Sequence, residues 1–267
     1  MHASEKLAEG GLDLAVEEGI GRLRLDRPHR KNAVNQAMWQ AIPAALALLS
    51  GDMQARIIVL SGAGGSDFSA GADITEFDTV RRDATTARAY ERANSEAFAA
   101  LRTASVPVIA SLRGVCFGGA FGLAAACDLR IGDTSCRFAV PAARLGLAYP
   151  ADAVVDMVTA LGAQRARHLL LTGDEMDAET ALAAGFLLTR TTPDALEAET
   201  VHLAQRIASA APLSIAAARA TVAAALSGDQ ERMHAARELG DTTFESADYA
   251  EGRAAFRDRR RPVFTGR

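Results

Sequence analysis

Lysine is nearly absent from this chain of 267 residues: only Lys6 and Lys31 are present, and arginine supplies almost all of the positive charge. Because 33 acidic residues face 29 basic ones, the formal net charge is −4 at pH 7. A chain with this balance has no general electrostatic attraction to nucleic acid or to an anionic membrane. We therefore expect neither a nucleic acid nor a membrane among its partners.

Cysteine and long apolar runs are scarce as well. Cys116, Cys127 and Cys136 form neither an even set nor a cluster with histidine at metal-ligand spacing. This pattern predicts small buried thiols in a reducing compartment and no metal site. Charged residues interrupt the N-terminal segment, and no apolar run approaches the roughly 18 residues of a membrane span. The sequence thus predicts a soluble, cytoplasmic protein.

Glycine and proline divide what remains into short segments. Up to about residue 190, short apolar runs such as 56–60 and 106–112 alternate with helical patterns, and beyond Pro193 only helical patterns follow. This order predicts an α/β core over residues 1–192 and a helical layer over residues 193–267. We expect the first ten residues to form a loose tail.

Two glycine-rich turns follow buried-strand patterns. One leads from residues 56–60 through 61–65 toward a possible helix start at Asp73, and the other leads through Gly118 and Gly119 into a helix of small residues. A helix that begins on glycine leaves free N–H groups at its positive end. Two such ends can each donate one N–H to a single oxygen, the minimum for an oxyanion hole. The alternative interpretation is a packing helix that needs glycine for a close approach.

A nucleotide-binding loop is the other interpretation of the glycines at residues 62–65. The dinucleotide fingerprint would need a third glycine where Asp67 stands and a helix directly after it. Neither is found, and no Gly-Lys-Ser sequence of a phosphate-binding loop is present. We therefore expect no nucleotide cofactor.

The motifs around the two turns resemble the enoyl-CoA hydratase/isomerase, or crotonase, family. Phe68-Ser-Ala-Gly-Ala-Asp-Ile74 and Gly114-x-x-x-Gly-Gly-Ala-x-x-Leu-x-x-x-Cys-Asp128 carry most of the likeness. Residues 27–35, 170–173 and 250–256 match further family segments in the same order. The resemblance covers nearly the whole chain. It implies a spiral core of ββα turns and a C-terminal helical oligomerisation layer that joins subunits into a homotrimer or hexamer.

The resemblance also implies a site for an acyl-CoA thioester. Ala72 and Gly119 would donate the two oxyanion N–H groups to the thioester carbonyl. Coenzyme A is part of the substrate in this family, so no separate cofactor is implied. The positions that would contact coenzyme A are Lys31, Ala33, Ala70, Asp73, Ile74, Phe256 and Arg259.

The chain departs from the family at the acid–base positions. The two glutamates with which hydratases of the family handle water would align with Gly122 and Ala142, and a third acidic position would fall on Pro150. Two carboxylates that bracket one water are the natural means of hydration. The resemblance implies the family label enoyl-CoA hydratase. The residues at these positions do not support hydration by two glutamates.

Two polar residues near these positions suggest other chemistry. The segment Leu145-Gly-Leu-Ala-Tyr149 resembles the loop of the family's methylmalonyl-CoA-type decarboxylases, which makes Tyr149 a candidate catalytic residue for decarboxylation; its alternative is a packed aromatic side chain. Asp152 is a candidate base for an isomerase, and its alternative is the N-cap of the helix that follows. A relative that binds acyl-CoA without turning it over is the hypothesis from another functional class.

Overall fold

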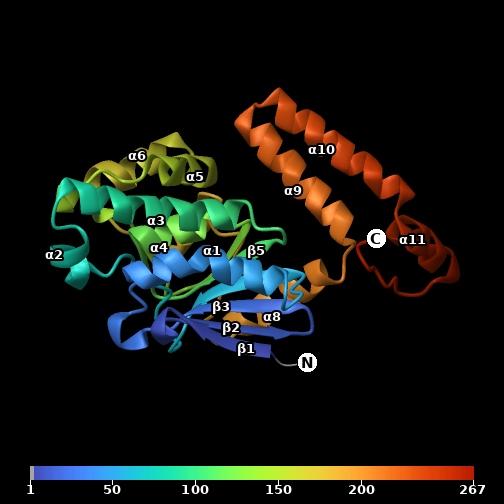
Figure 1. Cartoon of the computed structure of the whole chain (residues 1–267), viewed down its shortest axis with the longest axis horizontal. Coiled ribbons are helices and arrows are strands. Elements are labelled where there is room, and N and C mark those ends of the chain that lie inside the picture. Colours follow the sequence, from blue (N-terminus) through green and yellow to red (C-terminus); the bar gives the residue numbers. More distant parts are fainter. Residues whose placement is uncertain (1–2) are drawn as a thin grey trace.

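The computed structural model describes residues 3–267, in which strands and helices alternate as far as Thr191 and helices alone follow (Figure 1). The strands are β1 (Ala3–Leu7), β2 (Leu12–Glu17), β3 (Ile20–Leu25), β4 (Ile57–Gly62), β5 (Val108–Leu112), β6 (Val115–Phe117), β7 (Leu129–Asp133), β8 (Arg137–Ala139), β9 (Met176–Asp177) and β10 (Thr189–Thr191). The helices are α1 (Gln36–Ser50), α2 (Phe77–Val80), α3 (Ala84–Arg102), α4 (Gly119–Ala126), α5 (Ala151–Leu161), α6 (Ala163–Thr172), α7 (Ala178–Ala183), α8 (Leu196–Ala208), α9 (Pro212–Ser227), α10 (Gln230–Thr242) and α11 (Ala247–Asp258).

The strands form two sheets. The large sheet has the order β1-β2-β3-β4-β5-β7-β10, and β6, β8 and β9 form the small one. The first three strands of the large sheet pair antiparallel, whereas β3, β4, β5, β7 and β10 pair parallel. Strand β5 belongs to the large sheet, β6 follows in the small sheet, and helix α4 comes next. The same order is repeated by β7 in the large sheet, β8 in the small sheet and helix α5. This path confirms the predicted ββα spiral.

Strand β4 shows why both faces of the large sheet are buried. Ile58 and Leu60 belong to the core beneath α1 and α3, while Ile57 and Val59 belong to a second core beneath α8. Successive side chains of a strand point to opposite faces, so one apolar run supplies both cores. Figure 1 shows α1 and α3 above the sheet and α8 on its other side. Helix α8 therefore packs on the sheet, although it lies within residues 193–267.

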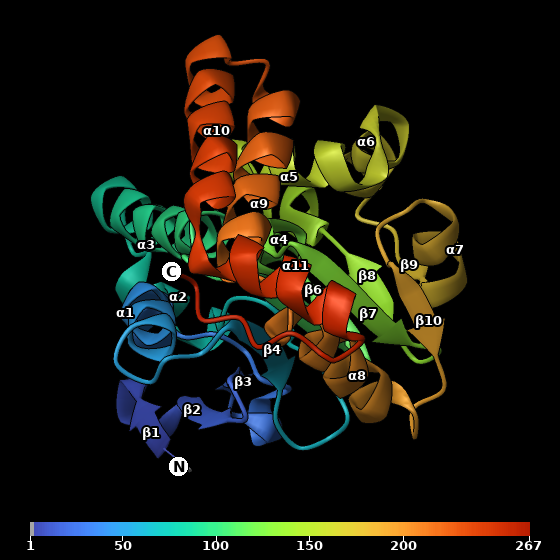
Figure 2. The same cartoon turned by 90° about the vertical axis from the view of Figure 1, so that its right-hand side faces the viewer.

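The last three helices extend away from the sheet. Helices α9 and α10 project as a pair, and α11 lies across the end of the molecule near the C-terminus (Figures 1 and 2). Large apolar side chains are exposed in this region, namely those of Val222 and Leu226 on α9, of Phe244 in the short turn between α10 and α11, and of Phe256 on α11. Within residues 3–267 no single helix is long and apolar enough to span a membrane, and α8 and α9 meet that test only as a pair bent by 105°. The oligomerisation role of this region stays a prediction.

The start of the chain differs from the expected loose tail. Residues Ala3–Leu7 form strand β1, which pairs antiparallel with β2 along its length. The backbone N–H and C=O groups at the edge of an antiparallel hairpin can pair with almost any sequence, so a segment without an apolar pattern can still become a strand. The part of the expected tail at residues 1–2 lies outside the described residues.

Candidate active site

Two backbone amides meet where the loop after β4 passes the start of α4. Gly71 has a φ of 93°, and a β-carbon there would lie 2.4 Å from the carbonyl oxygen of Phe117 and 3.2 Å from the nitrogen of Gly119. Only glycine fits this backbone contact. A β-carbon on Gly119 would in turn lie 3.6 Å from the amide nitrogen of Ala72. The two glycine turns therefore bring the amides of Ala72 and Gly119 together.

Both of these N–H groups are free to bind a ligand. Val34 pairs with the residues on either side of Ala72: it donates to Gly71 at 2.7 Å and accepts from Asp73 at 2.9 Å. Gly119 is the first residue of α4, where N–H groups have no acceptor within the helix. In the described part of the chain, no hydrogen bond uses the N–H of Ala72 or Gly119. Two such donors, one of them at a helix N-terminus, suit an oxygen that gains negative charge.

Helices α1 and α3 supply an apolar wall beside the two amides. A β-carbon on Gly119 would lie 2.9 Å from the six-membered ring of Trp39. The indole Nε1 of Trp39 donates to the hydroxyl of Tyr90 at 3.1 Å, and Phe98 packs edge-on against Trp39 with ring centroids 5.7 Å apart. All three aromatic side chains are fully buried. The sequence analysis did not select them, although Trp39 is the single tryptophan and follows the well-capped start of α1.

Tyr149 lies against the first turn of α4. Its hydroxyl donates to the carbonyl oxygen of Gly118 at 2.9 Å, and burial raises the pKa of this hydroxyl above its ordinary value. A β-carbon on Gly122 would lie 2.9 Å from the Tyr149 hydroxyl and 2.6 Å from the ring of Phe98. The structure thus places the Tyr149 hydroxyl against the first turn of α4, which begins at Gly119. The hydroxyl and the Phe98 ring fill the space that a side chain at residue 122 would need.

Asp152 lies on α5 and is tied to α3. Its carboxylate accepts a hydrogen bond from the Ser95 hydroxyl at 3.1 Å and pairs with Arg102 at 3.1 Å. These residues line an open cavity of about 580 Å³ between the two helices. Among residues 3–267, no hydrogen bond or ion pair joins Asp152 to Ala72 or Gly119.

The N-cap interpretation of Asp152 is wrong. Helix α5 begins at Ala151, the residue before Asp152. Its N-cap is Pro150, which provides no side-chain hydrogen bond. Asp152 is therefore inside the first turn, where its charge favours the helix through the dipole. Arg102 also pairs with Asp156 one turn further on, at 2.5 Å, and burial raises the pKa of the Asp156 carboxyl.

Most of the residues predicted to contact coenzyme A lie next to one another. The carbonyl oxygen of Lys31 accepts a hydrogen bond from the N–H of Ala70 at 2.9 Å. The guanidinium of Arg27 donates to the carbonyl oxygen of Ala33 and to the carboxylate of Asp73, each at 2.8 Å. Arg27 was not among the predicted residues, and it holds this group together.

Asp73 is held as a carboxylate within this group. Burial alone would raise its pKa, but hydrogen bonds from Thr75 and Arg27 outweigh burial and lower the pKa below the ordinary value. Ile74 follows it and is 62 % exposed. Phe256 and Arg259 lie apart from this group, at the end of α11, and Phe256 is 89 % exposed. Across residues 3–267, no hydrogen bond or ion pair connects Arg259 to the group.

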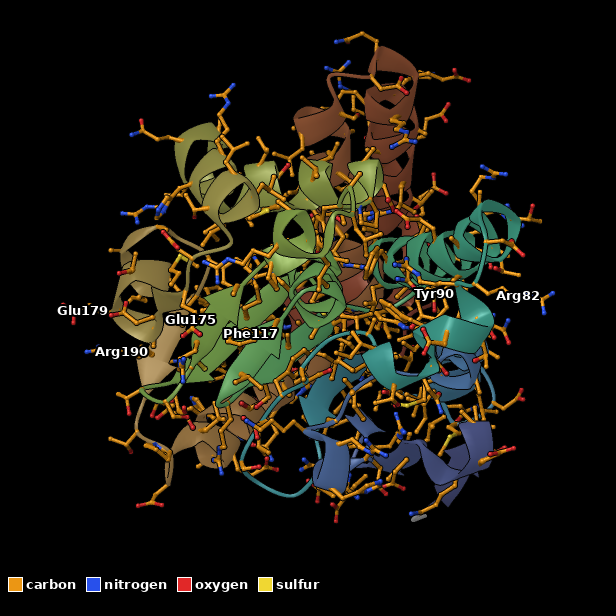
Figure 3. The ribbon with its side chains drawn as sticks, turned by 90° about the vertical axis from the view of Figure 1, so that its left-hand side faces the viewer. Arg82, Tyr90, Phe117, Glu175, Glu179 and Arg190 are labelled. Carbon is orange, nitrogen blue, oxygen red and sulfur yellow. The ribbon has the colours of Figure 1, made fainter. Side chains whose placement is uncertain are left out.

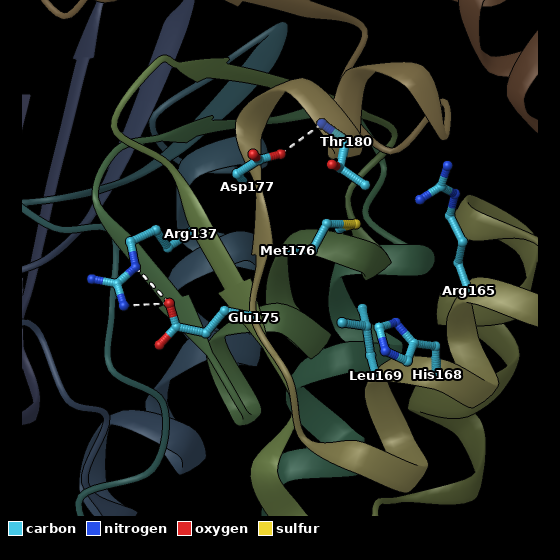
Figure 4. Close-up of a pocket in the computed structure, with 8 residues that line it drawn as sticks. All are labelled: Arg137, Arg165, His168, Leu169, Glu175, Met176, Asp177 and Thr180. Carbon is cyan, nitrogen blue, oxygen red and sulfur yellow. Dashed lines mark hydrogen bonds and ion pairs between the residues drawn. The ribbon is translucent and has the colours of Figure 1, made fainter.

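A polar cavity of about 460 Å³ lies elsewhere, between β9, α6 and α7 (Figure 4). Arg137 pairs there with Glu175, and Asp177 accepts from the N–H of Thr180 at 2.8 Å, so these groups stabilise the local structure. Figure 3 shows Glu175 and Tyr90 on opposite sides of Phe117, which places this cavity far from the aromatic wall. In residues 3–267, no three His, Cys, Asp or Glu side chains are grouped as a metal ion would require.

Known proteins match the chain over almost its whole length. The family model described as enoyl-CoA hydratase/isomerase matches residues 15–267. The crystal structure of an enoyl-CoA hydratase/carnithine racemase from Magnetospirillum magneticum superimposes with a TM-score of 0.92 at 34 % identity, covering 100 % of this chain and 97 % of that one.

Two curated relatives show the range of the likeness. The crotonyl-CoA hydratase of Syntrophomonas wolfei is 27 % identical over 97 % of this chain and 99 % of its own length. The trans-2-decenoyl-[acyl-carrier-protein] isomerase of Streptococcus mutans is 30 % identical over 94 % of this chain and 97 % of its own length. Together with the spiral core, these matches confirm the resemblance found in the motifs, and the chain belongs to the enoyl-CoA hydratase/isomerase, or crotonase, family.

Proposed function

We propose that this protein is an enzyme that processes acyl-CoA thioesters through a thioester enolate, with the enolate oxygen bound by the N–H groups of Ala72 and Gly119. The observation that carries the proposal is the meeting of these two unpaired donors beside a buried aromatic wall. Each preorganised donor is worth about 3 kcal/mol when charge develops on the oxygen. The relative named for crotonyl-CoA supports a substrate of this class, and the relative named for trans-2-decenoyl-[acyl-carrier-protein] supports an acyl group joined to a carrier.

The aromatic wall strengthens the interaction between the two N–H groups and the negative enolate oxygen. Trp39 and Phe98 are fully buried, and Trp39 presents its hydrocarbon ring beside Gly119. An N–H group acts more strongly on a negative oxygen where water and other polar groups are excluded. In this arrangement the backbone supplies the electrostatic stabilisation, and the side chains of α1 and α3 supply the dry surroundings.

The geometry does not favour hydration by two carboxylates. The space at Gly122 is filled by Phe98 and Tyr149, and Ala142 has no acidic group. Asp152, the candidate base from the sequence, is engaged by Arg102 and Ser95. A water molecule would therefore lack the paired base and acid that hydration requires.

Decarboxylation of a malonyl-type CoA thioester is the second candidate, and the position of Tyr149 favours it. The bond between the α-carbon and the carboxylate breaks, its electron pair passes into the enolate held by Ala72 and Gly119, and CO₂ leaves. The α-carbon then takes up one proton. The Tyr149 hydroxyl, kept neutral by its raised pKa, is the proton donor that lies against the first turn of α4.

A small substrate panel tests both proposals. Crotonyl-CoA, a 3-enoyl-CoA, methylmalonyl-CoA and ethylmalonyl-CoA are incubated with the protein, and the loss of each is followed by mass. Release of CO₂ that falls in Tyr149→Phe supports decarboxylation. Hydration of crotonyl-CoA at an enzymatic rate contradicts our interpretation of the acid–base positions, and loss of that rate in Asp152→Asn would identify the base. Binding of every thioester without turnover would instead identify a non-catalytic acyl-CoA binder.

We further propose that residues 193–267 join copies of the chain into a trimer or hexamer through α9, α10 and α11. The exposed apolar side chains of Val222 and Leu226, one turn apart on α9, and of Phe244 support this, because exposed apolar surface favours contact with another protein surface. In such an assembly Phe256 and Arg259 of one copy would reach the coenzyme A bound by another.

A further inference from the structure

The buried face of α3 carries a polar side chain whose carbonyl oxygen has no partner. Asn94 is 6 % exposed, and no group among residues 3–267 hydrogen-bonds its buried Oδ1 atom. A buried acceptor without a donor destabilises a fold, and nearly all such groups in proteins are paired. An apolar residue would pack on this face at less cost, so the carboxamide needs an explanation other than stability.

The neighbours of Asn94 on α3 both contact Trp39, the side chain that packs beside Gly119. Tyr90, Asn94 and Phe98 are spaced four residues apart, so they lie one above another on the same face of α3. Tyr90 contacts Trp39 through its hydroxyl, and Phe98 contacts the same indole ring edge-on. Both neighbours of Asn94 thus pack on the residue that touches Gly119, and the carboxamide lies between them.

Phe98 brings the same face of α3 to the far side of the site. Its ring would lie 2.6 Å from a β-carbon on Gly122, one turn of α4 beyond Gly119. The stripe formed by Tyr90, Asn94 and Phe98 therefore reaches the first turn of α4 at Phe98, and we infer that a thioester held at Ala72 and Gly119 extends its acyl group toward this stripe. Tyr90 already uses its hydroxyl on Trp39, which leaves Asn94 as the unpaired hydrogen-bonding group of the stripe.

We propose that Asn94 selects the acyl group: the site takes acyl-CoA thioesters whose acyl chain carries an oxygen substituent near the thioester, and the Asn94 carboxamide hydrogen-bonds that oxygen. This inference rests on the acyl-CoA function proposed above. A carboxamide has an acceptor and a donor that exchange places on a half-turn about χ2, so it can receive a hydroxyl or a carboxylate. A plain alkyl chain would leave the buried amide unpaired and bind less well.

Unreactive thioether analogues of acyl-CoA separate binding from turnover. The ligands are S-butyl-CoA, S-(3-hydroxybutyl)-CoA and S-(2-carboxyethyl)-CoA, whose dissociation constants are measured by calorimetry. We expect at least one oxygen-bearing ligand to bind about ten-fold more tightly than the butyl ligand. The hydroxybutyl and carboxyethyl ligands distinguish a hydroxyl substrate from a carboxylate one. Equal affinity for all three ligands overturns the role of Asn94.

Substitution of Asn94 provides the decisive comparison. In Asn94→Leu, which keeps the volume and removes the polar group, the preference for the oxygen-bearing ligand should disappear while thermal stability stays equal or rises. Arg88→Leu, an exposed polar-to-leucine change on the same helix, is the matched control and should keep the preference. Asn94→Ala serves as a second variant that removes the amide without filling its space.

The outcomes separate the two proposals. If Asn94→Leu retains the ligand preference, or loses stability because the amide is structural, the selection role is overturned whether or not the enzyme turns over any thioester. If the wild-type protein binds none of the three CoA ligands, the acyl-CoA function fails and the role of Asn94 fails with it.

Discussion

The hydroxyl of Tyr149 lies 2.9 Å from the point that a β-carbon on Gly122 would occupy. The two residues therefore exclude one another: a side chain at residue 122 would displace the tyrosine, and the tyrosine requires glycine. The motif spacing predicts that Gly122 aligns with the first hydratase glutamate of the family, and we therefore expect the Tyr149 phenol to take the place of a carboxylate from α4. Under the function proposed above, Ala72 and Gly119 remain as donors and Tyr149 is the polar group next to them.

We expect Gly122→Glu to destabilise the protein without creating a hydratase. The new side chain would meet Phe98 at 2.6 Å, and such overpacking costs about 1–3 kcal/mol. Ala142→Glu, on a half-buried turn, is the matched control and should change stability by less than about 0.5 kcal/mol. Urea unfolding and crotonyl-CoA hydration are the measurements. A stable Gly122→Glu variant that hydrates crotonyl-CoA would contradict the steric argument.

Gly119→Ala should abolish turnover while leaving thioester binding largely intact. The new methyl group would lie 3.6 Å from the Ala72 nitrogen, in the space for the enolate oxygen, and 2.9 Å from Trp39. The backbone N–H remains, but the methyl group keeps the oxygen away from it, and losing the use of one oxyanion donor costs about 100-fold or more in kcat. The double variant Gly119→Ala/Trp39→Phe removes the contact between the new methyl group and the Trp39 ring. The methyl group still occupies the position of the enolate oxygen, so the double variant should stay inactive. Gly240→Ala, where no atom lies within 4 Å of the added carbon, should keep full activity.

The strands that position the site were readable because they are buried on both faces. The runs at residues 56–60 and 106–112 predicted β4 and β5 within a few residues, since continuous apolar runs are typical of parallel strands covered by helices. Strand β1 was missed because its pairing with β2 at the sheet edge depends on backbone groups and leaves little pattern in the side chains. The strand order, with β7 and β10 beyond β5, also carries no local signature.

The part of the candidate site that consists of backbone N–H groups could be predicted from the sequence. The glycines before Ala72 and Gly119 indicated two helix-like starts, and the structure brings these two amides together. The side chains around them come from α1 and α3, which are distant in sequence, and helical spacing shows only that Trp39, Phe98 and Asn94 face inward. Which residue they touch depends on how the helices pack. The unpaired amide of Asn94 therefore became visible only in the fold.

Asp73→Asn should destabilise the protein by about 2 kcal/mol at neutral pH, because Arg27 would lose its buried partner. The folded pKa of Asp73 lies below the unfolded value, so the carboxylate contributes stability above about pH 4 that is lost as pH falls through the folded pKa. The difference between wild type and variant should therefore shrink on acidification. Urea unfolding at neutral and acidic pH measures it, and a pH-independent difference would contradict the pairing.

In the assembled protein, Arg259→Ala should weaken coenzyme A binding, whereas the same change at Arg253 should not. Arg259 ends α11 with a φ of 53° beside the exposed Phe256, so its side chain is available to a phosphate of a neighbouring copy. Arg253, on the same helix, instead stacks on Tyr249 with its guanidinium carbon 5.6 Å from the ring centroid. We expect about a ten-fold loss of affinity in Arg259→Ala, measured by calorimetry with coenzyme A.

A variant that cannot assemble tests whether the Arg259 that binds coenzyme A comes from a neighbouring copy or from the same chain. Leu226 is 65 % exposed on α9, and Leu226→Glu would place a charge in the surface that we expect to join copies. Light scattering should show a trimer or hexamer for the wild-type chain and smaller species for Leu226→Glu. If the arginine comes from another copy, Leu226→Glu alone should weaken coenzyme A binding, and adding Arg259→Ala should have no further effect. A wild-type monomer that binds coenzyme A through Arg259 would show that α11 folds back onto its own site.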